Sequence, residues 1–199
     1  PYGPGNYRGS WRVLDDTYTQ IATVSAGNDL EADIHDVDIT DDDTALVVVY
    51  NPIRMDLTAD GGRSDAIVLE AVVQEVDIAT GDVLFEWHSL DEIPVSDMAT
   101  GDITQAVVDY IHINSVEEDQ DGNILMSMRN TSELVKVNRT TGKVMWRLGG
   151  KGNDFTFTDG DDGPSLQHDA RRLPDGTISV FDNGNGHIPT ESRGVRWTV

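Results

Sequence analysis

The chain has 199 residues and carries 36 acidic against 14 basic side chains, which gives a net charge of −22. This balance excludes duplex nucleic acid as a partner, because phosphate neutralisation needs a basic face. Cysteine is absent, which excludes disulfides and thiolate chemistry. No apolar stretch reaches the roughly 18 residues of a membrane helix, so we expect no membrane span in this segment.

Short apolar runs separated by glycine, proline and Asx residues predict strands joined by tight turns. In chain order, one type of hairpin begins at Val13, recurs as V-D-I-A-T-G-D-V-L-F-E-W from Val76 and recurs again as V-N-R-T-T-G-K-V-M-W-R-L from Val137. A second type begins at His35, at His112 and at His168, where two strands flank an acidic turn. The starts of the first type lie 63 and 61 residues apart, so the sequence predicts an internal structural repeat.

Two hairpins per repeat make a four-stranded antiparallel sheet, and radial stacking of such sheets is a β-propeller. We therefore predict an all-β fold in which residues 1–199 form a single propeller segment of about three blades. Propellers need about four to eight blades to close, so we expect this segment to be a fragment of a larger chain whose ring has more blades. The segment between Ile93 and Tyr110 is predicted to be a long loop with one short helix.

Three of the five histidines, His35, His112 and His168, fall at the same place in the repeat, at the start of an innermost strand. Because innermost strands surround the central channel, these side chains are predicted to converge on one mouth of it. Such a cluster suits an anion, a nucleophilic histidine with helpers, or a metal.

Arg129 follows His112 after one acidic turn, so it is predicted to lie on the neighbouring strand near that histidine. Its planar guanidinium suits the oxygens of an anion, although an ion pair with one of the many aspartates is an equal alternative. Arg171 and Arg172 alternate faces, so only one of them can point inward. His88, at the end of an outer strand, is predicted to be exposed.

Several motifs resemble the run that is typical of arylsulfotransferases that need no nucleotide donor, in the branch found in fungi and actinobacteria. They are H-D-V-D-I-T from His35, I-H-I-N-S-V from Ile111, I-L-M-S-M-R-N-T-S from Ile124, V-M-W-R-L-G-G from Val144, Q-H-D-A-R from Gln167 and F-D-N-G from Phe181. The resemblance spans roughly residues 35–184, and the motifs come in the family's order.

The resemblance implies a six-bladed propeller that transfers a sulfuryl group from a phenolic sulfate ester to a phenol through a sulfohistidine. Carried over by motif, His168 is the nucleophile, His112 and Arg129 hold the sulfuryl oxygens, and His35 joins them. We also expect Arg171, Asn183 and His187 to contact the substrate. The resemblance implies no cofactor, no metal in this segment, small aryl sulfate and phenol partners, and an extracellular or periplasmic location.

Two other functions stay open at this point. A non-catalytic propeller could bind an anionic ligand or a protein through the same channel mouth. Alternatively, three converging histidines could ligate zinc or copper, although Arg129 beside them would repel a cation.

Overall fold

The computed structural model describes residues 8–199, which form β-strands, turns and loops. The first seven strands are β1 Trp11–Leu14, β2 Gln20–Val24, β3 Ala32–Ile39, β4 Thr44–Met55, β5 Ala66–Asp77, β6 Val83–His88 and β7 Val107–Val108. The others are β8 Ile113–Glu118, β9 Ile124–Met128, β10 Glu133–Val137, β11 Val144–Gly149, β12 His168–Arg172, β13 Thr177–Asp182 and β14 Arg193–Thr198. The all-β prediction is confirmed.

The described helical segments are three short 3₁₀ turns, η1 Thr58–Asp60, η2 Ser89–Asp91 and η3 Val95–Asp97. In this part of the chain, no helix is long and apolar enough to cross a membrane.

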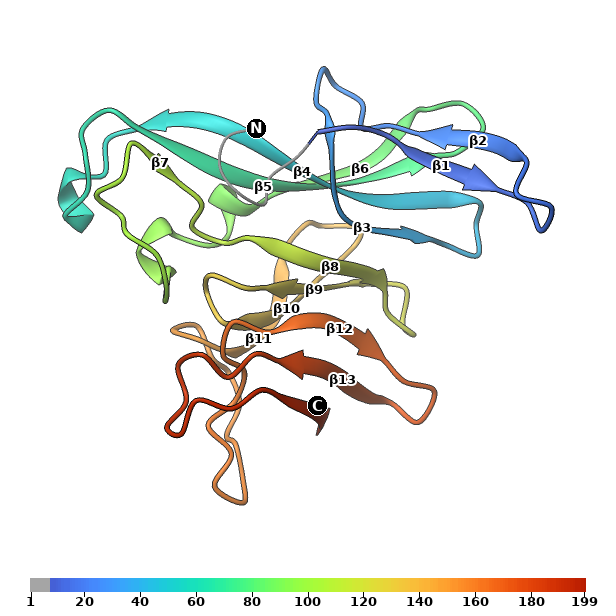
Figure 1. Ribbon diagram of the computed structural model, residues 1–199. Helices are drawn as coiled ribbons and strands as arrows, with labels where there is room; N and C mark the ends of the chain where they lie inside the picture. The colour runs from blue at the N-terminus through green and yellow to red at the C-terminus, as the bar shows by residue number, and fades with distance from the viewer. Residues whose placement is uncertain (1–7) are drawn as a thin grey trace.

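Strands β1 and β2 form a separate two-stranded sheet, and three larger sheets follow it along the chain. The first larger sheet has the strand order β3-β4-β5-β6, with the short β7 parallel to β5. The second has the order β8-β9-β10-β11, and the third has β12-β13-β14. Figure 1 shows that β8 lies between the first and third sheets, and the first strands of the three sheets are neighbours. The first strand of each sheet therefore forms part of one continuous row.

The outer hairpins repeat one another in detail. The pairs β1–β2, β5–β6 and β10–β11 are antiparallel, and each has a register shift just before its turn. The shifts fall between Val13 and Leu14, Glu75 and Val76, and Lys136 and Val137. In each turn an Asx side chain accepts hydrogen bonds from backbone N–H groups that follow it. The accepting residues are Asp15, Asp77 and Asn138. The predicted equivalence of these hairpins is confirmed.

Acidic side chains of β3 connect the first sheet to the second. The carboxylate of Asp36 accepts a hydrogen bond from the backbone N–H of Val116 at 2.9 Å, and that of Asp38 accepts one from Glu118 at 2.7 Å. These N–H groups lie on the edge of β8 that faces away from β9. Side chains of the first sheet thus accept hydrogen bonds from backbone N–H groups of the second sheet that have no partner strand on that edge.

The same connection recurs between the second and third sheets. Ser115 Oγ accepts from the backbone N–H of Ala170 at 3.0 Å, and the carboxylate of Glu117 accepts from the N–H of Arg172. Ser115 and Glu117 stand four and two residues before the β8–β9 turn that begins at Asp119, as Asp36 and Asp38 stand before the turn that begins at Thr40. One pattern of inter-sheet hydrogen bonds therefore sets the spacing of both sheet pairs.

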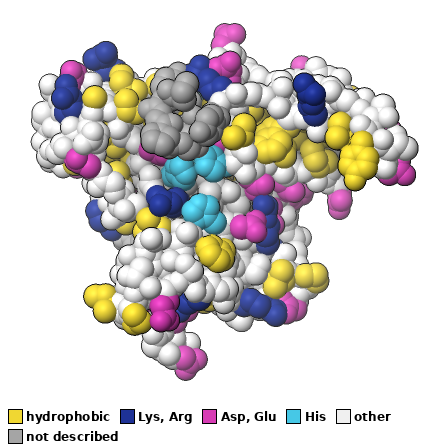
Figure 2. Space-filling model, in the orientation of Figure 1, with side chains coloured by type: hydrophobic (Ala, Val, Ile, Leu, Met, Phe, Trp, Pro, Cys, Tyr) yellow, Lys and Arg dark blue, Asp and Glu magenta, His cyan; other side chains and the backbone are white. Residues whose placement is uncertain are grey.

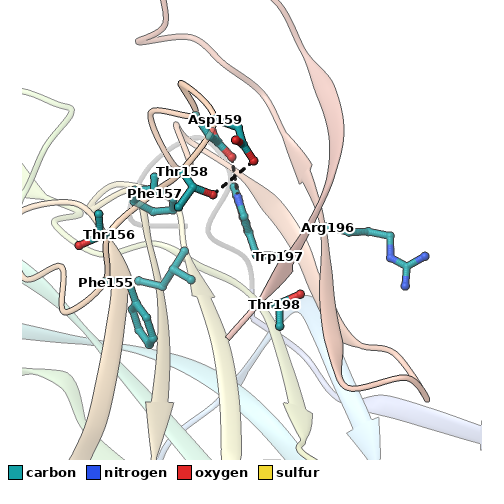
Figure 3. A pocket seen from close by; sticks show the side chains of 10 residues that line it. Phe155, Thr156, Phe157, Thr158, Asp159, Arg196, Trp197 and Thr198 are labelled. Carbon is teal, nitrogen blue, oxygen red and sulfur yellow. Dashed lines mark hydrogen bonds between the residues drawn. The ribbon is translucent and has the colours of Figure 1, made fainter.

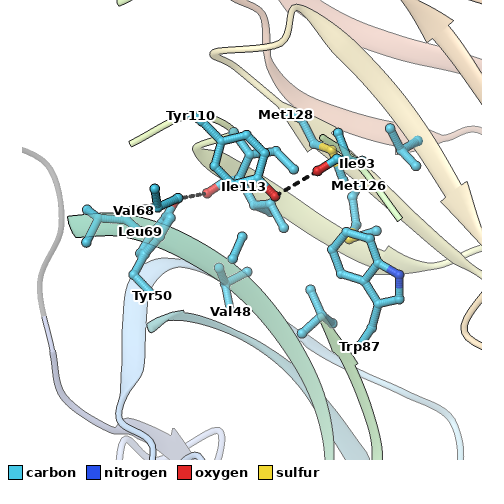
Figure 4. Close-up of a cluster of buried hydrophobic side chains, with 14 of the residues drawn as sticks. Val48, Tyr50, Val68, Leu69, Trp87, Ile93, Tyr110, Ile113, Met126 and Met128 are labelled. Atoms are coloured by element: carbon cyan, nitrogen blue, oxygen red, sulfur yellow. Dashed lines mark hydrogen bonds between the residues drawn. The ribbon is translucent and has the colours of Figure 1, made fainter. Parts of the chain in front are cut away.

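Apolar cores fill the space between the sheets. The larger core joins the first and second sheets around Tyr50, Leu69, Tyr110, Ile113 and Met126 (Figure 4). Tyr50 donates a hydrogen bond from its buried hydroxyl to the carbonyl of Ile113 at 2.9 Å, across the two sheets. A second core packs the other face of the second sheet against the third, with Leu125, Leu134, Ile178 and Trp197. Packing of these buried side chains fixes the relative position of the first strands of the sheets, which carry the candidate site.

Candidate functional site

The three predicted histidines lie on the row of first strands. His35 is in β3, His112 directly precedes β8, and His168 is the first residue of β12. The prediction that each histidine begins a strand is wrong for His35, because β3 already starts at Ala32. Figure 2 shows histidine side chains gathered in the middle of one face of the molecule, with a basic side chain beside them.

The histidines do not occupy fully equivalent positions. His35 and His168 each stand five residues before the turn that follows their strand, at Thr40 and Leu173, whereas His112 stands seven before Asp119. Irregular pairing at the start of all three strands and a left-handed backbone at His112, with φ of 51°, explain how they still converge. A left-handed backbone is uncommon for residues other than glycine.

His35 and His112 form a pair in which each imidazole has its own carboxylate. Their ring centroids are 4.8 Å apart with the planes at 81°, an edge-to-face contact. Nδ1 of His35 is hydrogen bonded to the buried Asp33, and Nδ1 of His112 lies 2.5 Å from Asp109 Oδ2. The hydrogen bond to Asp33 raises the pKa of His35 despite its burial, and the charge of Asp109 adds to this effect. The Asp33 carboxylate therefore favours a protonated His35.

Arg129 adjoins this pair, as predicted. Its backbone N–H donates to the carbonyl of His112 at 2.9 Å, directly after β9. Its guanidinium donates to Asn130 Oδ1 at 2.9 Å, and the Asn130 amide donates in turn to the carbonyl of Asp109. Within residues 8–199, Arg129 forms no ion pair with a carboxylate. The alternative of an Arg129–aspartate pair finds no support, and the positive charge stays available to an anion.

His168 has a different environment from the other two. Its Nδ1 lies 2.7 Å from the amide oxygen of Asn183, and no carboxylate is described beside its ring. Burial lowers the pKa of His168, and the nearby charges of Arg129 and His112 lower it further, against the opposite effects of hydrogen bonds to the Asn183 side chain and the Leu166 backbone. The surroundings of His168 thus favour a neutral imidazole, whereas the carboxylates beside His35 favour a cation.

Gln167 fixes His168 to the second sheet. Its fully buried amide nitrogen is within hydrogen-bonding distance of Ser127 Oγ at 3.0 Å and of the carbonyl of Glu133 at 2.9 Å. The carbonyl of Gln167 accepts from the amide of Asn114 at 2.7 Å. These contacts hold the start of β12 against β8 and β9, the strands that flank His112 and Arg129.

The other residues that the sequence singled out either lie outside the histidine cluster or are hydrogen bonded to other side chains. Arg171 is bound by Asp36 at 2.9 Å and by Asp169 at 2.7 Å, so two carboxylates offset its charge. His187 Nε2 lies 2.8 Å from the buried Asp182. Asn183 joins the site through His168. His88 does end an outer strand, but it is half-buried between Glu70 and Glu86 rather than exposed.

Metal binding has little basis in the described residues. Between residues 8 and 199, no three histidine, aspartate or glutamate side chains are arranged so that they could hold a metal ion together. The imidazoles of His35 and His112 are each directed at a carboxylate through Nδ1, and Arg129 adds a positive charge. The cluster suits an anion better than a cation.

A separate pocket lies between the loop 155–161 and β14, with a volume of about 360 Å³. Phe155, Phe157 and Trp197 supply its aromatic surface, and Asp161 accepts a hydrogen bond from Trp197 at 2.7 Å (Figure 3). In the same view the Arg196 side chain extends away from the aromatic rings. Acidic and aromatic side chains without an inward-facing cation do not suit a sulfate ester.

Sequence reasoning missed the partners that distinguish the histidines. Asp33 and Asp109 stand two and three residues before His35 and His112, so the short D-I-H and D-Y-I-H strings contained the signal. Gln167 stands in the Q-H-D-A-R motif, but nothing in the sequence showed that its amide would cross to another sheet.

We compared the chain with protein-family models, curated proteins and solved structures to find its family. The sequence model described as arylsulfotransferase (ASST) matches residues 3–197. No curated protein matches the chain. Among solved structures, a protein of unknown function from Bacteroides caccae is similar, with 15% sequence identity and a TM-score of 0.48. The match covers 96% of this chain and 55% of that one, so the chain spans about half the length of the similar structure. Because the family model matches almost the whole sequence, this chain belongs to the arylsulfotransferase family.

Proposed function

We propose that the protein transfers a sulfuryl group from a phenolic sulfate ester to a phenol, through a sulfohistidine at His168. The observation that carries this proposal is the contrast between His168, which faces the neutral amide of Asn183 and whose pKa is lowered by burial, and His35, which faces the carboxylate of Asp33 and whose pKa is raised. A neutral imidazole is a nucleophile, whereas Arg129 and a protonated His35 are suited to negative charge. Family membership supports the reaction type.

In the first half-reaction, the lone pair of a His168 ring nitrogen attacks the sulfur of the donor. The bond between sulfur and the phenolic oxygen breaks, and the departing phenolate takes a proton from the His35–His112 pair. Arg129 and this pair stabilise the charge that develops on the peripheral oxygens. The raised pKa of His35 lets it keep its proton to higher pH than an ordinary histidine does.

In the second half-reaction, an acceptor phenol returns a proton to the same pair and attacks the sulfur. The sulfur–nitrogen bond breaks, and His168 is again neutral. The order of events requires ping-pong kinetics, in which the first phenol leaves before the second binds.

We also propose that the three sheets are blades of a propeller ring, which six blades would complete. The repeated hydrogen bonds from Asp36 and Ser115 to the next first strand support this arrangement, because they relate successive sheets in the same way. The histidines would then surround one mouth of the channel. The family resemblance supports an extracellular or periplasmic location.

Steady-state kinetics with 4-nitrophenyl sulfate and a phenol test the proposed function. We expect ping-pong kinetics for the wild type and no transfer for His168→Ala. His88→Ala is the matched control, because this histidine lies on the outer strand β6 and should leave the rate unchanged. Retained transfer in His168→Ala would overturn the proposal. If sulfate esters bind but are not turned over, the non-catalytic function is favoured.

A further inference from the structure

The hydrogen-bond partners of the three histidines follow two chemical types. His35 and His112 face carboxylates, at Asp33 and Asp109, whereas His168 faces the neutral amide of Asn183. A carboxylate accepts a hydrogen bond and also stabilises a positive ring. An amide oxygen accepts the hydrogen bond without adding a negative charge.

This difference determines the tautomer of His168. When the Asn183 oxygen accepts from Nδ1–H, a neutral ring has no proton on Nε2, whose lone pair is then available. We propose that Asn183 is a positioning residue that holds His168 as the neutral Nδ1–H tautomer and so selects Nε2 as the atom that attacks sulfur. The inference rests on the proposed function for the attack, but the tautomer itself does not depend on it.

The charged groups around His168 explain why an amide is needed here. His112 and Arg129 face it from the second sheet. On its own sheet, Asp169 is bound to Arg171, and Asp182 is directed to His187 and Arg193. A carboxylate at position 183 would face the ring as Asp33 faces His35, and it would favour a protonated His168, which has no free lone pair.

Asn183 itself is held firmly enough to orient a ring. The preceding Asp182 is fully buried and accepts from the backbone N–H groups of Ser165 at 2.8 Å and Gly184 at 3.1 Å. Ser192 donates to the carbonyl of Asn183 at 3.0 Å. These contacts hold the backbone on both sides of Asn183, and its amide oxygen lies 2.7 Å from Nδ1 of His168.

The test is long-range ¹H–¹⁵N NMR of the histidine side chains, recorded as a function of pH on the protein and three variants. In the wild type we expect His168 to carry its proton on Nδ1 once neutral. Asn183→Asp should raise the pKa of His168 above its ordinary value of 6.5 and move the acid limb of the pH–rate profile to higher pH. Asn183→Ala should mix the tautomers and lower kcat about 10–100-fold with little change in KM, as for partners that orient metal-binding histidines.

Asn185→Asp is the matched control, because it places the same charge two residues away on an exposed side chain of the same loop. We expect it to leave the His168 titration unchanged. An Nε2–H tautomer in the wild type, or an unchanged titration in Asn183→Asp, would overturn this inference. Transfer that persists in His168→Ala would overturn the proposed function alone, since the tautomer is measured without substrate.

Discussion

Glu117 offers a stability test of how the sheets are joined. It lies on β8, is 13% exposed, and accepts a hydrogen bond from the backbone N–H of Arg172 on the third sheet. Burial raises the pKa of Glu117 from 4.5 to about 7, and the neighbouring Asp38 and Asp119 contribute. Its carboxyl group is therefore protonated in the folded protein at a pH where the unfolded chain has lost the proton.

The sign and size of the effect follow from linkage. A carboxyl with a raised pKa contributes stability that is fully present below pH 4.5 and is lost as pH rises through about 7. The full difference amounts to about 3 kcal/mol. Glu117→Gln keeps the oxygen acceptor and cannot ionise, so between pH 5 and pH 8 it should gain about 2 to 3 kcal/mol relative to the wild type.

Urea denaturation at pH 5 and pH 8 measures this difference as free energies of unfolding. Glu118→Gln is the matched control, because Glu118 is ion paired with Arg139 at 2.8 Å and its loss should not stabilise the protein at high pH. A free-energy difference between Glu117→Gln and wild type that is the same at both pH values would refute the reasoning.

Three further predictions concern the site and its frame. Arg129→Lys should lower kcat for 4-nitrophenyl sulfate by about 10²–10³, because a point charge cannot replace a planar fork on the sulfuryl oxygens; an unchanged kcat would remove Arg129 from the site. Asp33→Asn should lower the pKa of His35 and move the alkaline limb of the pH–rate profile to lower pH, because the acid must be protonated; an unmoved limb would show that His35 is not the acid. Asp36→Ala should cost about 1–3 kcal/mol in urea denaturation, since it leaves the N–H of Val116 without its acceptor; wild-type stability would contradict the role of this connection.

Much of the fold could be predicted from repetition in the sequence. The hairpins from Val76 and Val137 share a turn pattern that fixes their register, and the structure has both with the same shift. The hydrogen bonds between sheets could not be predicted, because alternating acidic residues such as Asp36 and Asp38 are typical of a solvent-exposed surface. Their partners are backbone N–H groups on β8, which the sequence does not place beside them.

The sequence indicated which residues of the candidate site lie close together better than it indicated their exact positions on the strands. The placement of His112 beside Arg129 followed from one short turn and is confirmed. The equal placement of all three histidines is wrong, because His112 lies two residues earlier in its repeat and converges through a left-handed backbone. Tautomers and charges depend on contacts between distant segments, as between His168 and Asn183, and a sequence pattern does not contain them.

The most direct measurement for the central claim is the site of covalent modification. The protein would be incubated briefly with 4-nitrophenyl sulfate without acceptor, quenched under alkaline conditions, digested and analysed by mass spectrometry. The account predicts an acid-labile adduct with the mass of one sulfuryl group on His168, which disappears when a phenol is added. An adduct on His112 or His35 instead, or donor turnover that leaves no adduct on any histidine, would contradict it.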